Sequence, residues 1–128
     1  MKRMSKELNI LLVAAQAEQM PFYDRLSQRY SLTAVECGCK ALHIMNDKPI
    51  DVLVTEAELA DMTGNELIAE AASHVETAAG VVIHANVQDC IIAESATPQG
   101  GLVEHLNLPV GEFTLFSAVD TLARRRNI

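Results

Sequence analysis

Short, mostly apolar runs alternate along this chain with segments of helical spacing, and that alternation constrains its fold more than any other feature. Each run is too short for a helix, and its nearly continuous apolar character is typical of a strand that is buried on both faces. The runs predict strands over Asn9–Ala14, Leu32–Glu36, Asp51–Thr55, Gly80–Ala85 and Val103–Asn107.

The segments between and after these strands carry apolar residues at helical spacing. They predict helices over 18–29, Lys40–Asn46, Gly64–Ser73, 87–94 and Glu112–Arg125, of which the fourth has the weakest pattern. Pro21 has to lie in the first turn of the first helix, or that helix begins later. Ser95–Gly101 contains Pro98 and two glycines and is expected to form a loop.

An alternation of strands and helices predicts an α/β fold, in which a parallel sheet is covered on both faces by right-handed crossovers. At this length the usual solution is a flavodoxin-like (βα)5 three-layer sandwich with strand order 2-1-3-4-5. Functional residues of such sheets gather beyond the carboxyl ends of the strands. That edge carries Ala14, Ala15, Glu56, His84 and Leu108.

The composition fits a single globular domain over residues 1–128, with 49% hydrophobic and 21% charged residues. The net charge of −7 argues against direct nucleic-acid binding, which needs a basic face. No apolar run approaches the roughly 20 residues that span a bilayer, and the basic N-terminus lacks the apolar region of a secretory signal. Three cysteines are too few for a disulfide framework, so we expect reduced thiols and a cytoplasmic protein.

Several stretches resemble, in order and spacing, the receiver domain of bacterial two-component response regulators. "ILLVAAQ" (10–16) resembles the first strand of that family, and "ECGCKALHIM" (36–45) resembles its small-residue turn and second helix. "PIDVLVTEAELADMTGNEL" (49–67) is similar to the third strand with the phosphoryl-acceptor loop. "VVIHAN" (81–86) and "HLNLPVGEFTL" (105–115) resemble the fourth strand and the fifth strand with the last helix. The resemblance covers nearly the whole chain and implies a role in phosphorelay signalling.

The residues that would carry phosphorylation differ from the family's pattern. Ala14 and Ala15 stand in place of the family's acidic pair, and Glu56 stands in place of the acceptor aspartate. His84 replaces the hydroxyl residue, Leu108 replaces the lysine, and His105 replaces the switch aromatic. Methyl groups cannot ligate Mg²⁺, which requires oxygen ligands, and a leucine cannot pair with a phosphoryl group. We therefore expect a degenerate pseudo-receiver that is not an enzyme and holds no metal.

Glu56 stands at the position of the acceptor aspartate, and three interpretations of its role are open. It is a partly exposed carboxylate that caps a loop or the helix start at Thr63–Gly64, or it forms a pair with His84. In the third interpretation it is a constitutive mimic of the phosphorylated state, which would have to engage the groups that a phosphoryl group engages.

The cysteines suggest a zinc or redox site only superficially. Cys37 and Cys39 follow the second strand while His84 and Cys90 follow the fourth, so the two groups should lie three strand spacings apart, roughly 14 Å. One zinc ion, which takes about four ligands, cannot bridge that distance. We expect buried or half-buried thiols and no cofactor.

The function expected from the resemblance is phosphorylation-independent interaction with a protein partner, or dimerisation. The interaction face should be formed by residues 87–94, Val103–Asn107 and Glu112–Arg125, around Val103, His105, Thr114 and Ser117. A histidine at position 105 either packs at the sheet edge or makes binding pH-sensitive. The chain is also consistent with the N-terminal part of a longer regulator that continues beyond Ile128. The alternative function is a small-ligand sensor that uses the altered pocket near Ala14, Ala15 and Leu108.

Overall fold

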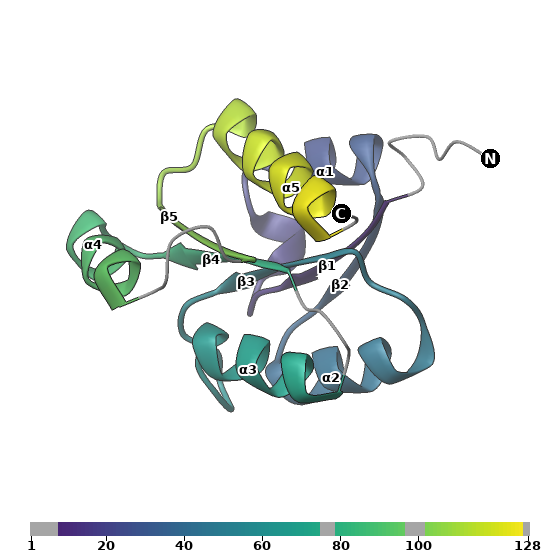
Figure 1. Cartoon of the computed structure of the whole chain (residues 1–128). Coiled ribbons are helices and arrows are strands. Elements are labelled where there is room, and N and C mark those ends of the chain that lie inside the picture. The colour runs from purple at the N-terminus through teal and green to yellow at the C-terminus, as the bar shows by residue number, and fades with distance from the viewer. Residues whose placement is uncertain (1–7, 75–78, 97–101, 127–128) are drawn as a thin grey trace.

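The computed structural model describes residues 8–74, 79–96 and 102–126, and it confirms the predicted sheet (Figure 1). Five strands lie in the order β2-β1-β3-β4-β5, and every neighbouring pair is parallel. The strands are β1 (Asn9–Val13), β2 (Ser31–Val35), β3 (Val52–Glu56), β4 (Gly80–His84) and β5 (Val103–Asn107).

Helices cover both faces of this sheet, as Figure 1 shows. One face carries α1 and α5, the opposite face carries α2 and α3, and α4 lies beside β4 and β5. The helices are α1 (Tyr23–Arg29), α2 (Gly38–Asp47), α3 (Gly64–His74), α4 (Val87–Ala96) and α5 (Glu112–Arg126). The architecture is thus the predicted flavodoxin-like three-layer sandwich.

Most element boundaries differ from the sequence-based expectation by one or two residues, and the first and fourth helices show why. The first helix begins late, at Tyr23, after a short 3₁₀ turn over Ala17–Gln19. Pro21 precedes it because proline has no N–H group and the residue before a proline avoids helical geometry. The fourth helix continues through Ala96 and so includes the first two residues of the expected loop Ser95–Gly101. The remainder of that loop, 97–101, lies outside the described residues.

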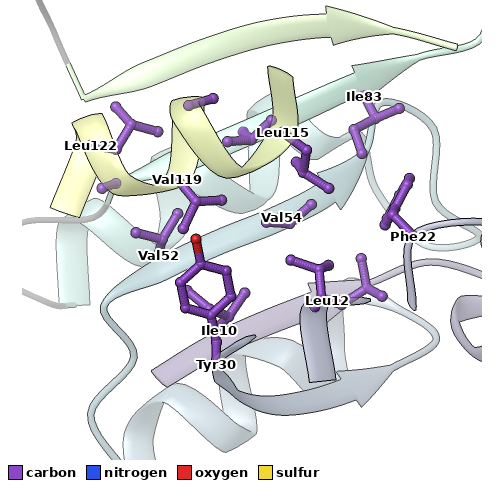
Figure 2. Close-up of a cluster of buried hydrophobic side chains, with 14 of the residues drawn as sticks. Ile10, Leu12, Phe22, Tyr30, Val52, Val54, Ile83, Leu115, Val119 and Leu122 are labelled. Carbon is purple, nitrogen blue, oxygen red and sulfur yellow. The ribbon is translucent and has the colours of Figure 1, made fainter. Parts of the chain in front are cut away.

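The core consists of one apolar layer on each side of the sheet. Successive side chains of a strand point to opposite faces, so each buried strand supplies both layers. On the α1/α5 side, Leu115, Val119 and Leu122 of α5 lie over Val52 and Val54 of β3 (Figure 2). The layer on the α2/α3 side includes Leu11, Val13, Leu53, Val82, Leu67 and Ile68. This double burial explains why the central strands are apolar throughout.

A polar cluster joins α1 to α5 at the margin of the first layer. The Tyr30 hydroxyl donates a hydrogen bond to Asp120 Oδ1 over 2.8 Å, and Arg29 Nη2 donates to Asp120 Oδ2 over 2.9 Å. The ring of Tyr30 also meets Phe116 edge-on, with 6.1 Å between the ring centroids. Burial raises the pKa of Tyr30 to about 12.

Among the described residues, no helix combines the length and apolar character that a membrane crossing requires.

Candidate functional site

The carboxyl edge of the sheet brings the predicted site positions into one row. Ala14 and Ala15 follow β1, Glu56 ends β3, His84 ends β4 and Leu108 follows β5. The strand register aligns the row, because Glu56 pairs with Ile83 and the Leu108 amide donates to the His84 carbonyl over 2.9 Å. The parallel topology therefore confirms that these positions share an edge.

Glu56 is engaged by the main chain of the neighbouring loop. The Ala15 N–H group donates a hydrogen bond to Glu56 Oε1 over 3.0 Å, so the half-buried carboxylate caps the loop that follows β1. The alternative cap at the start of α3 is wrong, because Thr63 and Glu66 cap that helix reciprocally. Of the three interpretations of Glu56, the loop cap is the one that this hydrogen bond matches.

The predicted Glu56–His84 pair does not form, because His84 pairs with His105 instead. His84 Nε2 lies 3.0 Å from His105 Nδ1, and the ring centroids are 5.2 Å apart. The reason lies in strand alternation. Glu56 follows the direction of Val54 toward the α1/α5 layer, whereas His84 follows Val82 toward the opposite face.

Burial lowers the pKa of both histidines, each of which is 5% exposed. The carboxylates of Asp89 and Glu94 on α4 oppose this effect at His84, and Glu94 also opposes it at His105. The proximity of His84 lowers the pKa of His105 further. Both rings are therefore neutral near pH 7, where one N–H group between the facing nitrogens satisfies the contact. The sequence signal for this pair was the position of both histidines on one face of adjacent strands.

The residues at this edge do not fit a Mg²⁺ ion. Ala14 and Ala15 offer only methyl groups, Leu108 is aliphatic, and one oxygen of Glu56 already accepts a hydrogen bond. Mg²⁺ demands near-octahedral oxygen coordination, for which this donor set is unsuited. In the part of the chain that the structure describes, no three His, Cys, Asp or Glu side chains are placed to hold a metal ion.

The three cysteines are free thiols and do not converge. Cys90 is buried and Cys37 is half-buried, as expected, but Cys39 is exposed at the second position of α2. The strand order separates β2 from β4 by three spacings, which confirms the reason given for excluding a shared zinc site.

The loop between β3 and α3 is anchored on the N-terminus of α2, which the sequence alone did not reveal. Asp61 accepts hydrogen bonds from the amides of Gly38 and Cys39 over 2.9 and 2.8 Å. These bonds hold the pKa of the Asp61 carboxyl below its usual range. Met62 packs against Gly38, where any side chain would collide with its sulfur.

A hollow of about 420 Å³ opens beside the ends of β1 and β2. Its walls include Ala14, Ala15, Glu18, Glu36 and Lys40, and Glu36 and Lys40 form an ion pair. The hollow therefore contains the two alanines of the expected altered pocket, but it extends toward β2 and not toward Leu108.

The expected interaction face is only partly exposed. Thr114 and Ser117 line a groove of about 450 Å³ between β5 and α5, together with Phe113, which is 88% exposed. His105 is buried and Val103 packs against the α2/α3 layer, so the placement of His105 on the surface was wrong. The strand alternation turns Glu104 and Leu106, not Val103 and His105, toward the groove.

Comparisons with known proteins point to one fold. No family model matches the chain. Transcriptional regulatory protein GlrR of Escherichia coli is 28% identical over 97 residues, which are 73% of this chain and 21% of that protein. The chain thus spans about a fifth of the length of this curated relative.

Two crystal structures illustrate the likeness in three dimensions. A response regulator receiver domain protein from Clostridium thermocellum superposes with a TM-score of 0.77 at 17% identity, covering 94% of this chain and 97% of that one. A response regulator receiver protein from Sinorhizobium medicae gives a TM-score of 0.78 at 23% identity, covering 94% and 98%. The chain has the fold of response regulator receiver domains.

Proposed function

We propose that this chain is a receiver-like signalling module that works without phosphorylation of its acceptor position, through binding to a protein partner or to a second copy. The observation that carries the proposal is the carboxyl edge itself. Ala14 and Ala15 supply no metal ligands, Leu108 supplies no cation, and Glu56 is bonded to a main-chain amide. Phosphoryl transfer depends almost entirely on positioning and charge neutralisation, which these residues do not supply. The proposed setting is the bacterial cytoplasm.

A constitutive phosphate mimic receives less support from the same edge. The donor to Glu56 is the Ala15 amide, Leu108 carries no donor, and His84 is engaged with His105. A mimic acts by drawing such donors toward itself, so Glu56 is better described as a structural cap than as a permanent activator.

The face formed by α4, β5 and α5 supports the binding part of the proposal. Large apolar side chains are exposed there, at Val87, Ile91 and Ile92 on α4 and at Phe113 on α5. Phe113 lines the groove between β5 and α5, and large exposed apolar side chains are typical of protein interaction surfaces. We extend the proposal to a longer regulator in which this domain precedes others.

Incubation with a small phosphodonor and Mg²⁺, followed by intact mass measurement, tests the central claim. We expect no added phosphoryl group on the wild-type chain. The Glu56→Ala variant is the matched control, because it removes the carboxylate at the acceptor position. A phosphoryl group that appears on the wild type and disappears in this variant contradicts the proposal.

A sedimentation series over protein concentration distinguishes the two occupants of the proposed face. If the occupant is a second copy, Phe113→Ser should weaken dimerisation by about tenfold or more, the usual effect of truncating a central aromatic. Gln28→Ser on α1, also exposed, is the control. A monomer at all concentrations points to a different protein as the partner.

A small-ligand sensor is the second candidate, and the hollow near Ala14 and Ala15 is the observation that favours it. Amide shifts of Ala15, Glu36 and Lys40 in a titration with nucleotides and apolar metabolites would support this alternative. Unchanged shifts would leave the hollow without a ligand of those classes.

A further inference from the structure

His84 and His105 form a buried pair on the side of β4 and β5 that α4 covers. Their facing nitrogens, Nε2 and Nδ1, are 3.0 Å apart. A single hydrogen fits between them, because one nitrogen must donate and the other must accept. The first additional proton can bind to a ring nitrogen that points away from the contact, so the hydrogen bond between the facing nitrogens is kept. The second places hydrogens on both facing nitrogens and breaks the contact.

The helix above this pair has little apolar support of its own. Cys90 is the buried residue of α4, whereas Val87, Ile91 and Ile92 are mostly exposed. By comparison, α5 buries Leu115, Ala118, Val119, Leu122 and Ala123. Elements with few buried apolar contacts open at lower free energy than the rest of a domain. The docking of α4 therefore depends strongly on what lies beneath it.

We propose that the His84–His105 pair is a proton-sensitive contact that keeps α4 docked on β4 and β5 while both rings are neutral, and that releases α4 when both are protonated. Among the described residues, the carboxylates that act on the rings are Asp89 and Glu94 of α4. Their carboxylates favour the first proton, but they cannot restore a hydrogen bond between two donors. The inference stands apart from the proposed function, because its readout is the position of α4 and not the binding of a partner.

The direction of the pH dependence follows from proton linkage. A solvent-exposed imidazole has a pKa of about 6.5, and burial lowers the pKa of both rings in the docked state. The undocked state therefore binds more protons below pH 6.5, so the contribution of the pair to docking is fully present above that pH and is lost as the pH falls. The ratio of undocked to docked molecules rises by up to about tenfold per proton for each pH unit.

Amide hydrogen exchange of the whole chain, followed by NMR at pH 7.5 and 5.5, tests this inference. After correction for the intrinsic rate, we expect protection in α4 to fall by about tenfold or more, while α3 and the central strands keep theirs. Unchanged protection in α4 overturns the inference. A parallel loss throughout the sheet also overturns it, because acid would then unfold the domain and not release one helix.

A double variant separates the histidines from other acidic effects. His84→Gln with His105→Asn keeps an amide donor and acceptor near the positions of Nε2 and Nδ1 but does not titrate, so protection in α4 should become independent of pH. His43→Gln, which removes an exposed histidine of α2, is the matched control and should behave like the wild type. Wild-type behaviour in the double variant overturns the inference.

If the double variant fails to fold, ring titration in the wild type still decides the matter. The chemical shifts of the carbon-bound ring protons of His84 and His105 should change with pH below 6.5, at the same midpoint as the amide shifts of α4. Ring titration that leaves the α4 amides unchanged overturns the inference.

Discussion

Gly64, the first residue of α3, occupies a place with no room for a side chain. An added Cβ atom would lie 2.6 Å from the carbonyl oxygen of Glu56 and 3.1 Å from a methyl carbon of Thr55. The Gly64 amide also donates to the Ala57 carbonyl, so the helix start is tied directly to the end of β3. Gly111, ahead of α5, differs: its nearest neighbour to an added Cβ would be Thr114 Oγ1 at 3.8 Å.

These two glycines give a matched pair of substitutions. We expect Gly64→Ala to lower the free energy of unfolding by about 1–3 kcal/mol, since the backbone at Glu56 must move to relieve the overlap. We expect Gly111→Ala to cost less, at most about 1 kcal/mol, because no neighbour has to move and only the preference for glycine over alanine at the N-cap of α5 is lost. Chemical denaturation measures both values. Equal effects of the two substitutions would contradict this account.

At the scale of elements, the β3–α3 loop and α2 are joined by Asp61. Its carboxylate accepts hydrogen bonds from two amides at the N-terminus of α2. The helix dipole makes a negative charge favourable at that end of a helix. The amides keep the pKa of Asp61 below its usual range. A depressed pKa means that the stabilisation is present above the unfolded-state pKa and is lost as the pH falls through the folded-state value.

Asp61→Asn should lower the melting temperature at pH 7, because a neutral amide accepts these bonds less strongly than a carboxylate. The difference from the wild type should begin to shrink below the unfolded-state pKa of about 4 and should vanish once the pH falls below the lower pKa that Asp61 has in the folded state. Melting curves between pH 7 and 3 measure this convergence. Glu58→Gln in the same loop is the control, and a control that behaves identically would show that general charge, not the helix N-terminus, is responsible.

Most of the elements could be predicted from local pattern, whereas this anchor could not. The apolar runs identified every strand to within a residue or so, because burial on both faces leaves little choice of residue type. Even the weakly patterned α4 was found. Asp61, in contrast, reaches α2 only through the path of the β3–α3 loop, and no periodicity encodes such a path.

At the scale of the whole molecule, Tyr30 and Asp120 connect the two helices that cover one face of the sheet. The hydroxyl of Tyr30 is bonded to Asp120, and its ring is packed within the α1/α5 layer (Figure 2). Burial is the main reason that the pKa of Tyr30 rises from 10.0 to about 12. The neutral hydroxyl is thus favoured by folding, and this contribution is lost as the pH rises from 10 toward 12.

Tyr30→Phe should cost about 1 kcal/mol at pH 7, through the lost hydrogen bond, while it keeps the contact with Phe116. Above pH 10 the wild type should lose stability more steeply than the variant, because ionisation of Tyr30 favours the unfolded chain. Denaturation curves from pH 7 to 11 test this. Tyr23→Phe removes the other tyrosine hydroxyl and is the control; parallel alkaline curves for wild type and Tyr30→Phe would contradict the assignment.

The global topology could be predicted from the order of elements, and with it the row of residues at the carboxyl edge. The pairing within that row could not be obtained from proximity in the topology alone. Glu56 and His84 end adjacent strands, yet opposite parity turns them to opposite faces. The same parity buried His105 and left Leu106 half-buried at the groove between β5 and α5. Strand register, and not residue chemistry, decides which side chains meet.

The hydrogen bond that Glu56 receives at position 15 comes from the main chain, so it is indifferent to the side chain there. Every residue except proline supplies the same N–H group. Substitutions at position 15, other than proline, should therefore leave the hydrogen bond to Glu56 and the path of the loop unchanged. An aspartate at position 14 or 15 would lie near a carboxylate that already accepts a main-chain hydrogen bond, and metal binding by Glu56 would first require that this bond be broken.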